Sequence, residues 1–259
     1  ISEDACRTLE AIVGPEYITT DPVYCMAYTG HGYGREIFWY QGVGQTPACI
    51  VLPENTDQVA RVIRACNRYN IPFHPMSTHC FALVGPMFSG ANSVLIDLRR
   101  MNRMWIDDKN MYAVVEPAII YAEMQGAILK RDLCSVNPGG GGVAAVASNH
   151  LVQGQGIFNW RITPYSLRRM NAVEWVTPEG EIHRFGSFVE GDDHGYWQDG
   201  LGPNVMGLLK GYVSWTGAMG ILTKVATKLY PFQPQELESD GLGPNTCVKF
   251  PPRVRYYNM

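Results

Sequence analysis

The chain has 259 residues, enough to bury a substantial core in one large domain or two small ones. Hydrophobic residues make up 46% and charged residues 17% of the sequence, which excludes a disordered chain. The formal net charge is −3 and no basic stripe is present, which argues against a nucleic-acid partner. No apolar run approaches the roughly 20 residues of a membrane span, so we expect no membrane-spanning helix.

Seven cysteines are spread widely along the sequence, without a Cys-x-x-Cys pair. This odd, scattered set argues against a disulfide framework, an iron–sulfur cluster and a zinc site, and no metal site is predicted. Free thiols are typical of a reducing compartment, and the first residues do not resemble an intact signal peptide. We therefore expect a cytoplasmic protein.

The first 46 residues are expected to form an arm outside the main domain. A helical pattern surrounds Leu9, Ile12 and Val13, and a segment rich in glycine and aromatic residues follows at 28–42. Its alternating glycines lack the spacing of a dinucleotide-binding turn, and no strand precedes them. We interpret this segment as an irregular arm.

Residues 47–97 carry a β-α-β pattern. Apolar runs at 48–52 and 93–97 predict two short strands. Between them, Asn55 is a good helix N-cap with Gln58 three residues later, and the helical stripe ends near Asn70. A polar loop is predicted at 76–81. This order of elements is typical of an α/β fold.

The later elements follow in the same style. Residues 111–116 predict a strand, and Ile120, Met124, Ala127 and Ile128 predict the inward face of a helix that ends near 130–131. Residues 172–176 and 181–185 predict a hairpin around a turn at 177–180. A helix is expected at 204–213 and a half-exposed strand at 221–229. From Pro231 onward no core pattern is visible.

The segment with the clearest functional interpretation is Asn137–Asn149. Its four consecutive glycines, Gly139–Gly142, leave a loop without Cβ atoms, so backbone N–H groups can approach a ligand closely. The alternative is a flexible linker. A linker would be extended by Ser, Thr or Lys, whereas this run passes directly into an apolar Ala/Val segment. We therefore interpret it as a ligand-contacting loop.

Several common motifs are absent from the sequence. Neither the run at 139–142 nor Gly154-Gln-Gly156 has the spacing of a nicotinamide-binding fingerprint, and no P-loop or G-x-S-x-G elbow exists. His74, His79 and Cys80 lie on one short segment without a partner cluster. A structural or cofactor role is favoured for them over metal ligation.

Six segments, taken in order, resemble one family. They are 51–59, 75–78, 94–98, 113–117, 174–182 and 217–224. Together they resemble the FAD-binding domain of the vanillyl-alcohol oxidase / p-cresol methylhydroxylase (PCMH-type) superfamily, which includes glycolate oxidase and D-lactate dehydrogenase flavin subunits. The resemblance implies an α+β (α/β) fold in which FAD lies between two subdomains, at about 47–116 and 117–234. Residues 235–259 would begin a substrate-binding cap, and the catalytic residues are expected in that cap.

The resemblance also implies which residues contact FAD. The pyrophosphate would meet the loop at 77–79 and the glycine run, residues 154–156 and 220–221 would lie near the isoalloxazine, and backbone near Ile182 would meet the adenine side. The full expected set is Pro75, Ser77, Thr78, His79, Cys80, Pro138, Gly139, Gly140, Gly141, Gly142, Ser148, Asn149, Gly154, Gly156, Ile182, Gly220 and Ile221.

A covalent flavin link is a further expectation from the resemblance. Some branches place a linking histidine in the first phosphate loop, where His79 stands, and others add a cysteine ahead of the glycine loop, where Cys134 stands. The alternatives are that His79 hydrogen-bonds a phosphate oxygen and that Cys134 is a buried core thiol.

The function implied is an FAD-dependent oxidoreductase, and a dehydrogenase is favoured over an oxidase. It would transfer a hydride from a 2-hydroxy acid or related alcohol to flavin N5 and pass electrons to a partner protein or quinone. One alternative is a para-alkylphenol or aryl-alcohol enzyme, and another is a non-catalytic or electron-relaying flavin subunit of a larger complex. A homo- or hetero-oligomer is compatible with each.

Overall fold

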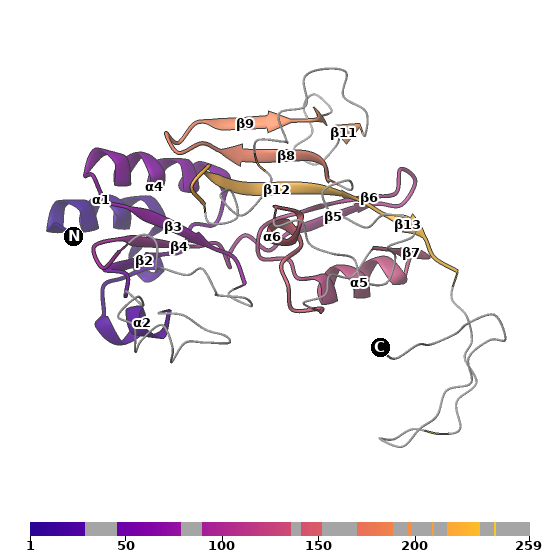
Figure 1. Ribbon diagram of the computed structural model, residues 1–259, viewed down its shortest axis with the longest axis horizontal. Coiled ribbons are helices and arrows are strands. Elements are labelled where there is room, and N and C mark those ends of the chain that lie inside the picture. The colour runs from indigo at the N-terminus through magenta and orange to yellow at the C-terminus, as the bar shows by residue number, and fades with distance from the viewer. Residues whose placement is uncertain are drawn as a thin grey trace, which may run out of the picture.

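The computed structural model of the chain describes residues 1–28, 46–78, 90–135, 141–151, 170–188, 196–197, 209, 217–233 and 241. Most of the strands among these residues form two sheets. Figure 1 shows the two sheets side by side, each with helices packed against it. One sheet is mixed and the other is antiparallel, which confirms the α+β class.

The first sheet has the strand order β1-β2-β4-β3. Its strands are β1 (Ile18–Thr19), β2 (Cys49–Val51), β3 (Phe73–Met76) and β4 (Val94–Asp97). Both β2 and β3 pair in parallel with β4, whereas β1 is antiparallel to β2. Because parallel strands end at a common edge, Val51, Met76 and Asp97 all lie at one edge of this sheet.

Helices cover both faces of the first sheet. On one face, α1 (Glu3–Val13) and α4 (Thr56–Arg68) share a buried cluster with Cys49 and Ile96. On the other face, Cys25 of α2 (Pro22–Ala27) packs against Ile50 and Leu95. A single turn of 3₁₀ helix, η1 (Pro15–Tyr17), connects α1 to β1. The strands are buried on both sides, as is usual for parallel sheets.

The second sheet is antiparallel, with the order β5-β6-β12-β8-β9. Its strands are β5 (Met104–Asp107), β6 (Tyr112–Val115), β8 (Met170–Val176), β9 (Ile182–Phe185) and β12 (Ile221–Lys228). Side chains of α5 (Tyr121–Leu129) and α6 (Val146–Leu151) join the buried cluster on one face. Two small antiparallel pairs lie beyond: β7 (Leu133–Cys134) with β13 (Tyr230–Pro231), and β10 (Ser187–Phe188) with β11 (Tyr196–Trp197).

Helix α4 also packs against the second sheet, so the two sheets share a core. Val176 and Ile221, from β8 and β12, belong to the same buried cluster as the apolar face of α4. The turn after β8 lies on this helix as well, because Asn67 Nδ2 donates a hydrogen bond to the Pro178 carbonyl at 2.7 Å. Gly180 in that turn has φ +83°, and a Cβ there would meet Arg64 Cγ at 2.7 Å. Only glycine fits this approach.

The strongest local predictions are confirmed. Asn55 caps α4, with its Oδ1 accepting from Gln58 N–H at 2.9 Å, and the Gln58 side chain accepts from Glu54 N–H at 2.9 Å. The hairpin is present as β8 and β9, with Val176 opposite Ile182. Strands β2, β4, β6 and β12 and helices α1 and α5 lie where they were expected.

Other predictions differ from the structure. β3 was predicted only as the entry to a loop, and β5 was not predicted. The strand at 221–229 was expected to be half-exposed, yet β12 is mostly buried because it is central in the sheet and its threonines have partners on other elements. Strands β5 and β6 join the second sheet, so the chain passes from the first sheet to the second between Asp97 and Met104. The domain limits themselves stay a prediction.

Two predicted segments lie almost entirely outside the described residues: the arm at 28–42, apart from Tyr28, and the helix at 204–213, apart from Leu209. Among the residues that the structure describes, no helix is long and apolar enough to cross a membrane.

Candidate functional site

The first predicted loop begins at the carboxyl edge of the first sheet. Pro75 lies on β3 opposite Ile96, and Ser77 and Thr78 follow the strand directly. In open sheets with parallel strands, ligands bind at the carboxyl ends of the strands. The two hydroxyl side chains are therefore placed where a ligand of this sheet would lie.

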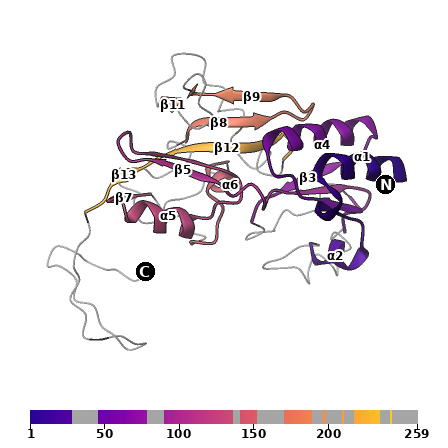
Figure 2. The same cartoon turned by 180° about the vertical axis from the view of Figure 1, so that it is seen from behind.

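Helix α6 brings a second hydroxyl to this loop. Ser77 Oγ and Ser148 Oγ lie 2.9 Å apart and share a hydrogen bond, although 71 residues separate them in the sequence. In both views of the ribbon, α6 lies where the two sheets meet (Figures 1 and 2). The structure thus brings together two predicted site residues. Ser77 follows a strand of the first sheet, and Ser148 lies on a helix that packs against the second sheet.

The end of the glycine run is held against α5. The Gly142 carbonyl accepts from Ala122 N–H at 2.8 Å, and a Cβ at Gly142 would come within 3.0 Å of the Ala122 Cβ. Gly141 is different: its φ is +74°, and a Cβ there would meet no atom of the described residues within 4 Å. Gly142 is small because α5 is close, whereas Gly141 leaves open space beside the backbone.

Asn149 follows Ser148 and points to a different neighbour. Its Nδ2 donates to the Tyr121 hydroxyl at 3.0 Å, and both side chains are buried. Tyr121 is the first residue of α5, and its backbone N–H donates to the Ala144 carbonyl at 3.0 Å. Asn149 therefore joins α6 to the start of α5.

A glycine turn ahead of β12 lies on the first loop. Gly217 has φ +85°, and a Cβ there would collide with the ring of Pro75. Gly220 has φ +98°, and a Cβ there would collide with the Val176 carbonyl and meet Trp175 Nε1 at 2.6 Å. Trp175 Nε1 also donates to the Met219 carbonyl at 2.7 Å. This turn therefore contacts β3 through Gly217 and β8 through Gly220, and the buried Ile221 follows it opposite Val176.

Two predicted residues lie on other strands, one in the second sheet and one in the small β7–β13 pair. Ile182 begins β9, an edge strand, and its side chain is exposed. Cys134 is half-buried on β7 opposite Tyr230, and its thiol lies 3.9 Å from the Pro231 carbonyl. Burial raises the pKa of the Cys134 thiol, which lowers the fraction present as the reactive thiolate.

The remaining predicted residues lie outside the described part of the chain: His79, Cys80, Pro138, Gly139, Gly140, Gly154 and Gly156.

A charged group that sequence reasoning missed stands beside the first loop. Asp97 ends β4 opposite Met76 and is fully buried. Its Oδ2 accepts from the Tyr28 hydroxyl at 2.8 Å and from Arg99 Nε at 2.6 Å. Burial raises the pKa of Asp97 despite these partners, and burial together with the nearby carboxylate raises the pKa of Tyr28 to about 12. The sequence did carry a sign of this group, because Asp97 is an acidic residue at the end of an otherwise apolar strand.

Three other residues were missed: Tyr121, His150 and Thr227. His150 follows Asn149 and is fully buried, with Nδ1 2.7 Å from the Val146 carbonyl and Nε2 2.9 Å from Thr227 Oγ1. The partners of these side chains are distant in sequence, or the residue itself lies within a run of apolar residues. Composition and periodicity carried no signal for them.

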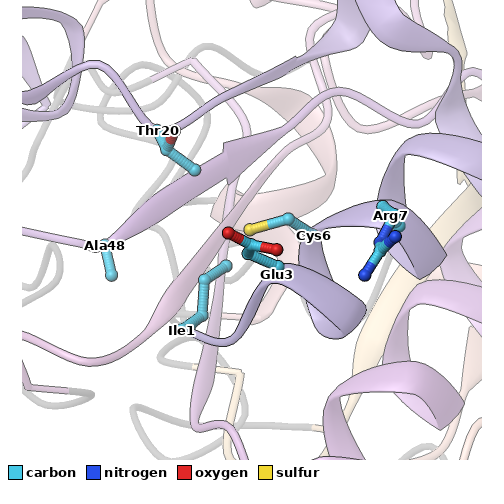
Figure 3. Close-up of a pocket in the computed structure, with 6 residues that line it drawn as sticks. All are labelled: Ile1, Glu3, Cys6, Arg7, Thr20 and Ala48. Atoms are coloured by element: carbon cyan, nitrogen blue, oxygen red, sulfur yellow. The ribbon is translucent and has the colours of Figure 1, made fainter.

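A separate cavity of about 420 Å³ lies at the start of α1. It is lined by Ile1, Glu3, Cys6, Arg7, Thr20 and Ala48, which Figure 3 shows around the cavity. None of these residues belongs to the predicted cofactor set. Within the described residues, no cluster of His, Cys, Asp and Glu side chains could hold a metal ion.

The FAD binding domain family matches residues 47–186, more than half of the chain, and the chain belongs to this family. The solved structure of p-cresol methylhydroxylase shares this fold, with a TM-score of 0.68 at 21% identity, and FAD is the cofactor of the family.

Two curated relatives and one solved structure illustrate the similarity. The glycolate oxidase subunit GlcD of Bacillus subtilis is 24% identical over 238 residues, which are 89% of this chain and 46% of that protein. The 4-cresol dehydrogenase flavoprotein subunit of Pseudomonas putida is 27% identical over 214 residues, 78% of this chain and 38% of that protein. The structure of 4-ethylphenol oxidase from Gulosibacter chungangensis superposes with a TM-score of 0.69 at 23% identity, covering 90% of this chain and 43% of that one. The chain therefore spans less than half the length of these relatives.

The described residues fit such a cofactor. A dinucleotide needs open space beside the backbone and donors for its phosphate oxygens, and Gly141 supplies the space while Ser77 and Ser148 supply hydroxyls. Ser135, just before the glycine run, adds a buried hydroxyl that has no hydrogen-bond partner within the described part of the chain. A buried hydroxyl without a partner costs about 1–3 kcal/mol, which a ligand could offset.

Proposed function

We propose that the chain is the cofactor-binding part of an FAD-dependent oxidoreductase that oxidises a 2-hydroxy acid or a related alcohol. The observation that carries this proposal is the family match over residues 47–186, combined with the meeting of Ser77 and Ser148 at the carboxyl edge of the first sheet. Similarity to a glycolate oxidase subunit supports the substrate class. When bound, FAD would accept a hydride at its N5 atom.

In this proposal the chain's own residues bind and orient the diphosphate. The Ser77 and Ser148 hydroxyls would turn from each other to donate to phosphate oxygens, and the backbone at Gly141 would approach them without a Cβ in the way. The Gly217–Gly220 turn, which lies on Pro75 and Trp175, would cover the site and exclude water. Substrate-binding and catalytic residues would come from a cap that begins after residue 234.

We propose that electrons leave to a protein or quinone acceptor, so that the enzyme is a dehydrogenase. The support is the similarity to a 4-cresol dehydrogenase flavoprotein subunit, whose name describes one part of a larger assembly. The described cysteines, Cys6, Cys25, Cys49, Cys66 and Cys134, are all free thiols, which supports a cytoplasmic location.

A second candidate substrate is a para-alkylphenol. The 4-cresol dehydrogenase subunit has the higher identity of the two curated relatives described above, and 4-ethylphenol oxidase shares the fold. A third candidate is an electron-relaying subunit that oxidises no alcohol itself.

Anaerobic reduction of the flavin separates the three candidates. Purified protein is mixed with a panel of 2-hydroxy acids and, separately, of para-alkylphenols, and the loss of the oxidised flavin absorption band is followed. We expect bleaching by a 2-hydroxy acid and slow return of the band in air. Bleaching by phenols alone favours the second candidate, and a flavin reduced only by a partner protein favours the third. A protein that carries no flavin would refute the proposal as a whole.

The covalent link at His79, with a second at Cys134, stays a separate proposal. Acid precipitation followed by a peptide map tests it, because a tethered flavin precipitates with the protein and adds its mass to the peptide. Flavin that remains wholly in the supernatant, with an unmodified His79 peptide, would exclude the tether. The raised pKa of Cys134 lowers its thiolate fraction and so disfavours the second link.

A further inference from the structure

Three consecutive side chains of α6 bind three different elements. Ser148 bonds to Ser77 after β3, Asn149 to Tyr121 of α5, and His150 to Thr227 of β12. The start of this short helix is fixed by its backbone, since the Val146 N–H donates to the Ile119 carbonyl at 2.9 Å. The side chains of 148–150 therefore fix its second half.

The hydrogen bonds of His150 fix one ring nitrogen as a donor. Nδ1 lies 2.7 Å from the Val146 carbonyl, which can only accept, so Nδ1 carries the proton. Nε2 lies 2.9 Å from the Thr227 hydroxyl and shares a hydrogen bond with it. His150 and Thr227 are both fully buried, so no water competes for this bond.

We infer that His150 and Thr227 are positioning residues of the cofactor site, and that they act through Ser148. This inference rests on the cofactor role proposed for Ser148. β12 is the central strand of the second sheet and forms a rigid base. The His150–Thr227 bond fixes the rotation of α6 on that strand, and the rotation fixes where the Ser148 hydroxyl points. Neither positioning residue needs to touch FAD.

The test is a double-mutant cycle between Thr227 and Ser148. Thr227→Val removes the hydroxyl at nearly constant shape and keeps a β-branched side chain in the strand. Thr227→Ser keeps the hydroxyl and is the matched control. Apoprotein of each variant, and of Ser148→Ala and the double variant, is titrated with FAD, and the fast reversible phase of fluorescence quenching gives the dissociation constant. Thermal unfolding of each apoprotein is measured in parallel.

We expect Thr227→Val to weaken FAD binding by about 3- to 10-fold, the range of one hydrogen bond, and Thr227→Ser to restore it. In the Ser148→Ala background, Thr227→Val should weaken binding no further, although it should lower the unfolding temperature equally in both backgrounds. A merely structural role would give additive effects on binding, and this result would overturn the inference. Unchanged binding in Thr227→Val would also overturn it.

The outcomes separate this inference from the proposed function. If unaltered protein binds no FAD, the proposed function fails. If it binds FAD and Ser148→Ala binds equally well, the role of Ser148 and this inference fail together, while FAD binding stands. If Ser148→Ala weakens binding but the cycle is additive, only the positioning role is wrong.

Discussion

At the residue scale, two glycines of the same run have opposite reasons to lack a side chain. Gly142 is limited by α5, because a Cβ would press on Ala122 at 3.0 Å. Within the part of the chain that the structure describes, Gly141 has no such limit, since a Cβ there would meet nothing within 4 Å. The space beside Gly141 is therefore available to a ligand. Substitution at Gly141 should affect cofactor binding more than folding.

Gly141→Val tests this distinction. The positive φ of Gly141 makes any L side chain cost about 1–3 kcal/mol, and the added atoms would occupy the ligand's space. We expect soluble protein that has lost FAD, measured as the flavin-to-protein absorbance ratio after gel filtration. Gly126→Ala is the control, because Gly126 lies in α5 with open space and an ordinary φ. That variant should keep its flavin and gain up to about 1 kcal/mol of stability. Full flavin retention in Gly141→Val would mean that the loop does not approach the cofactor.

Residues whose role depends on neighbours in sequence could be predicted, whereas residues defined by contacts distant in sequence could not. Asn55 and Gln58 form a cap within one helical turn, so the pattern was visible. Ser77 and Ser148 entered through the family resemblance, and their contact could not be predicted from either segment alone. His150 and Thr227 were missed because a buried polar pair interrupts an apolar pattern and only the folded chain shows the partner.

At the element scale, the same limit explains the strands that were predicted wrongly or not at all. β3 contains His74 and Pro75, which are typical of a loop. It is nevertheless a strand, paired with β4 at the edge of the first sheet. Proline is tolerated at a sheet edge, where its missing N–H is not needed. β12 alternates Thr and Lys with apolar residues, which is the pattern of an exposed face. Thr223 is instead buried, because its hydroxyl donates a hydrogen bond to the Glu174 carboxylate on the neighbouring strand.

Glu174 joins α4 to the second sheet. Its side chain is 2% exposed and accepts from Thr56 Oγ1 at 2.5 Å and from Arg184 Nε at 2.9 Å, with Lys224 Nζ at 3.4 Å. Burial alone would raise the pKa of Glu174, but the hydrogen bond from Thr56 and the two cations outweigh it and lower the pKa. The carboxylate is therefore more stable in the folded chain than in the unfolded one.

A lowered carboxylate pKa makes stability depend on pH in one direction. The contribution of Glu174 is fully present above its ordinary pKa of 4.5 and is lost as the pH falls through the lower, folded-state value. Glu174→Gln should destabilise the protein by about 2–4 kcal/mol, because the nearly buried Lys224 loses its counter-charge. Urea unfolding at pH 7 and below pH 4.5 checks both points. The difference between unaltered protein and variant should shrink in acid, and a constant difference would contradict the assignment.

At the scale of the whole molecule, the two sheets are not independent. The cluster formed by α1, α4, β2 and β4 includes Val176 and Ile221 from the second sheet. The proposed FAD site spans the same junction, with Ser77 on one side and Ser148 on the other. A shared core predicts one cooperative unfolding transition, and a ligand bound across the junction should stabilise both sheets equally.

Hydrogen exchange read by mass spectrometry tests this prediction sheet by sheet. Amides of β4 report the first sheet, and amides of β12 report the second. We expect the same free energy of opening for both in the apoprotein. Both should gain about 2.7 kcal/mol when free FAD is 100-fold above its dissociation constant. Exposed amides in α2, a short helix whose Val23 and Tyr24 face solvent, open locally and should not change, which makes them the internal control. Protection confined to one sheet would show that FAD does not bridge the junction, and unequal opening in the apoprotein would show that α4 does not couple the sheets.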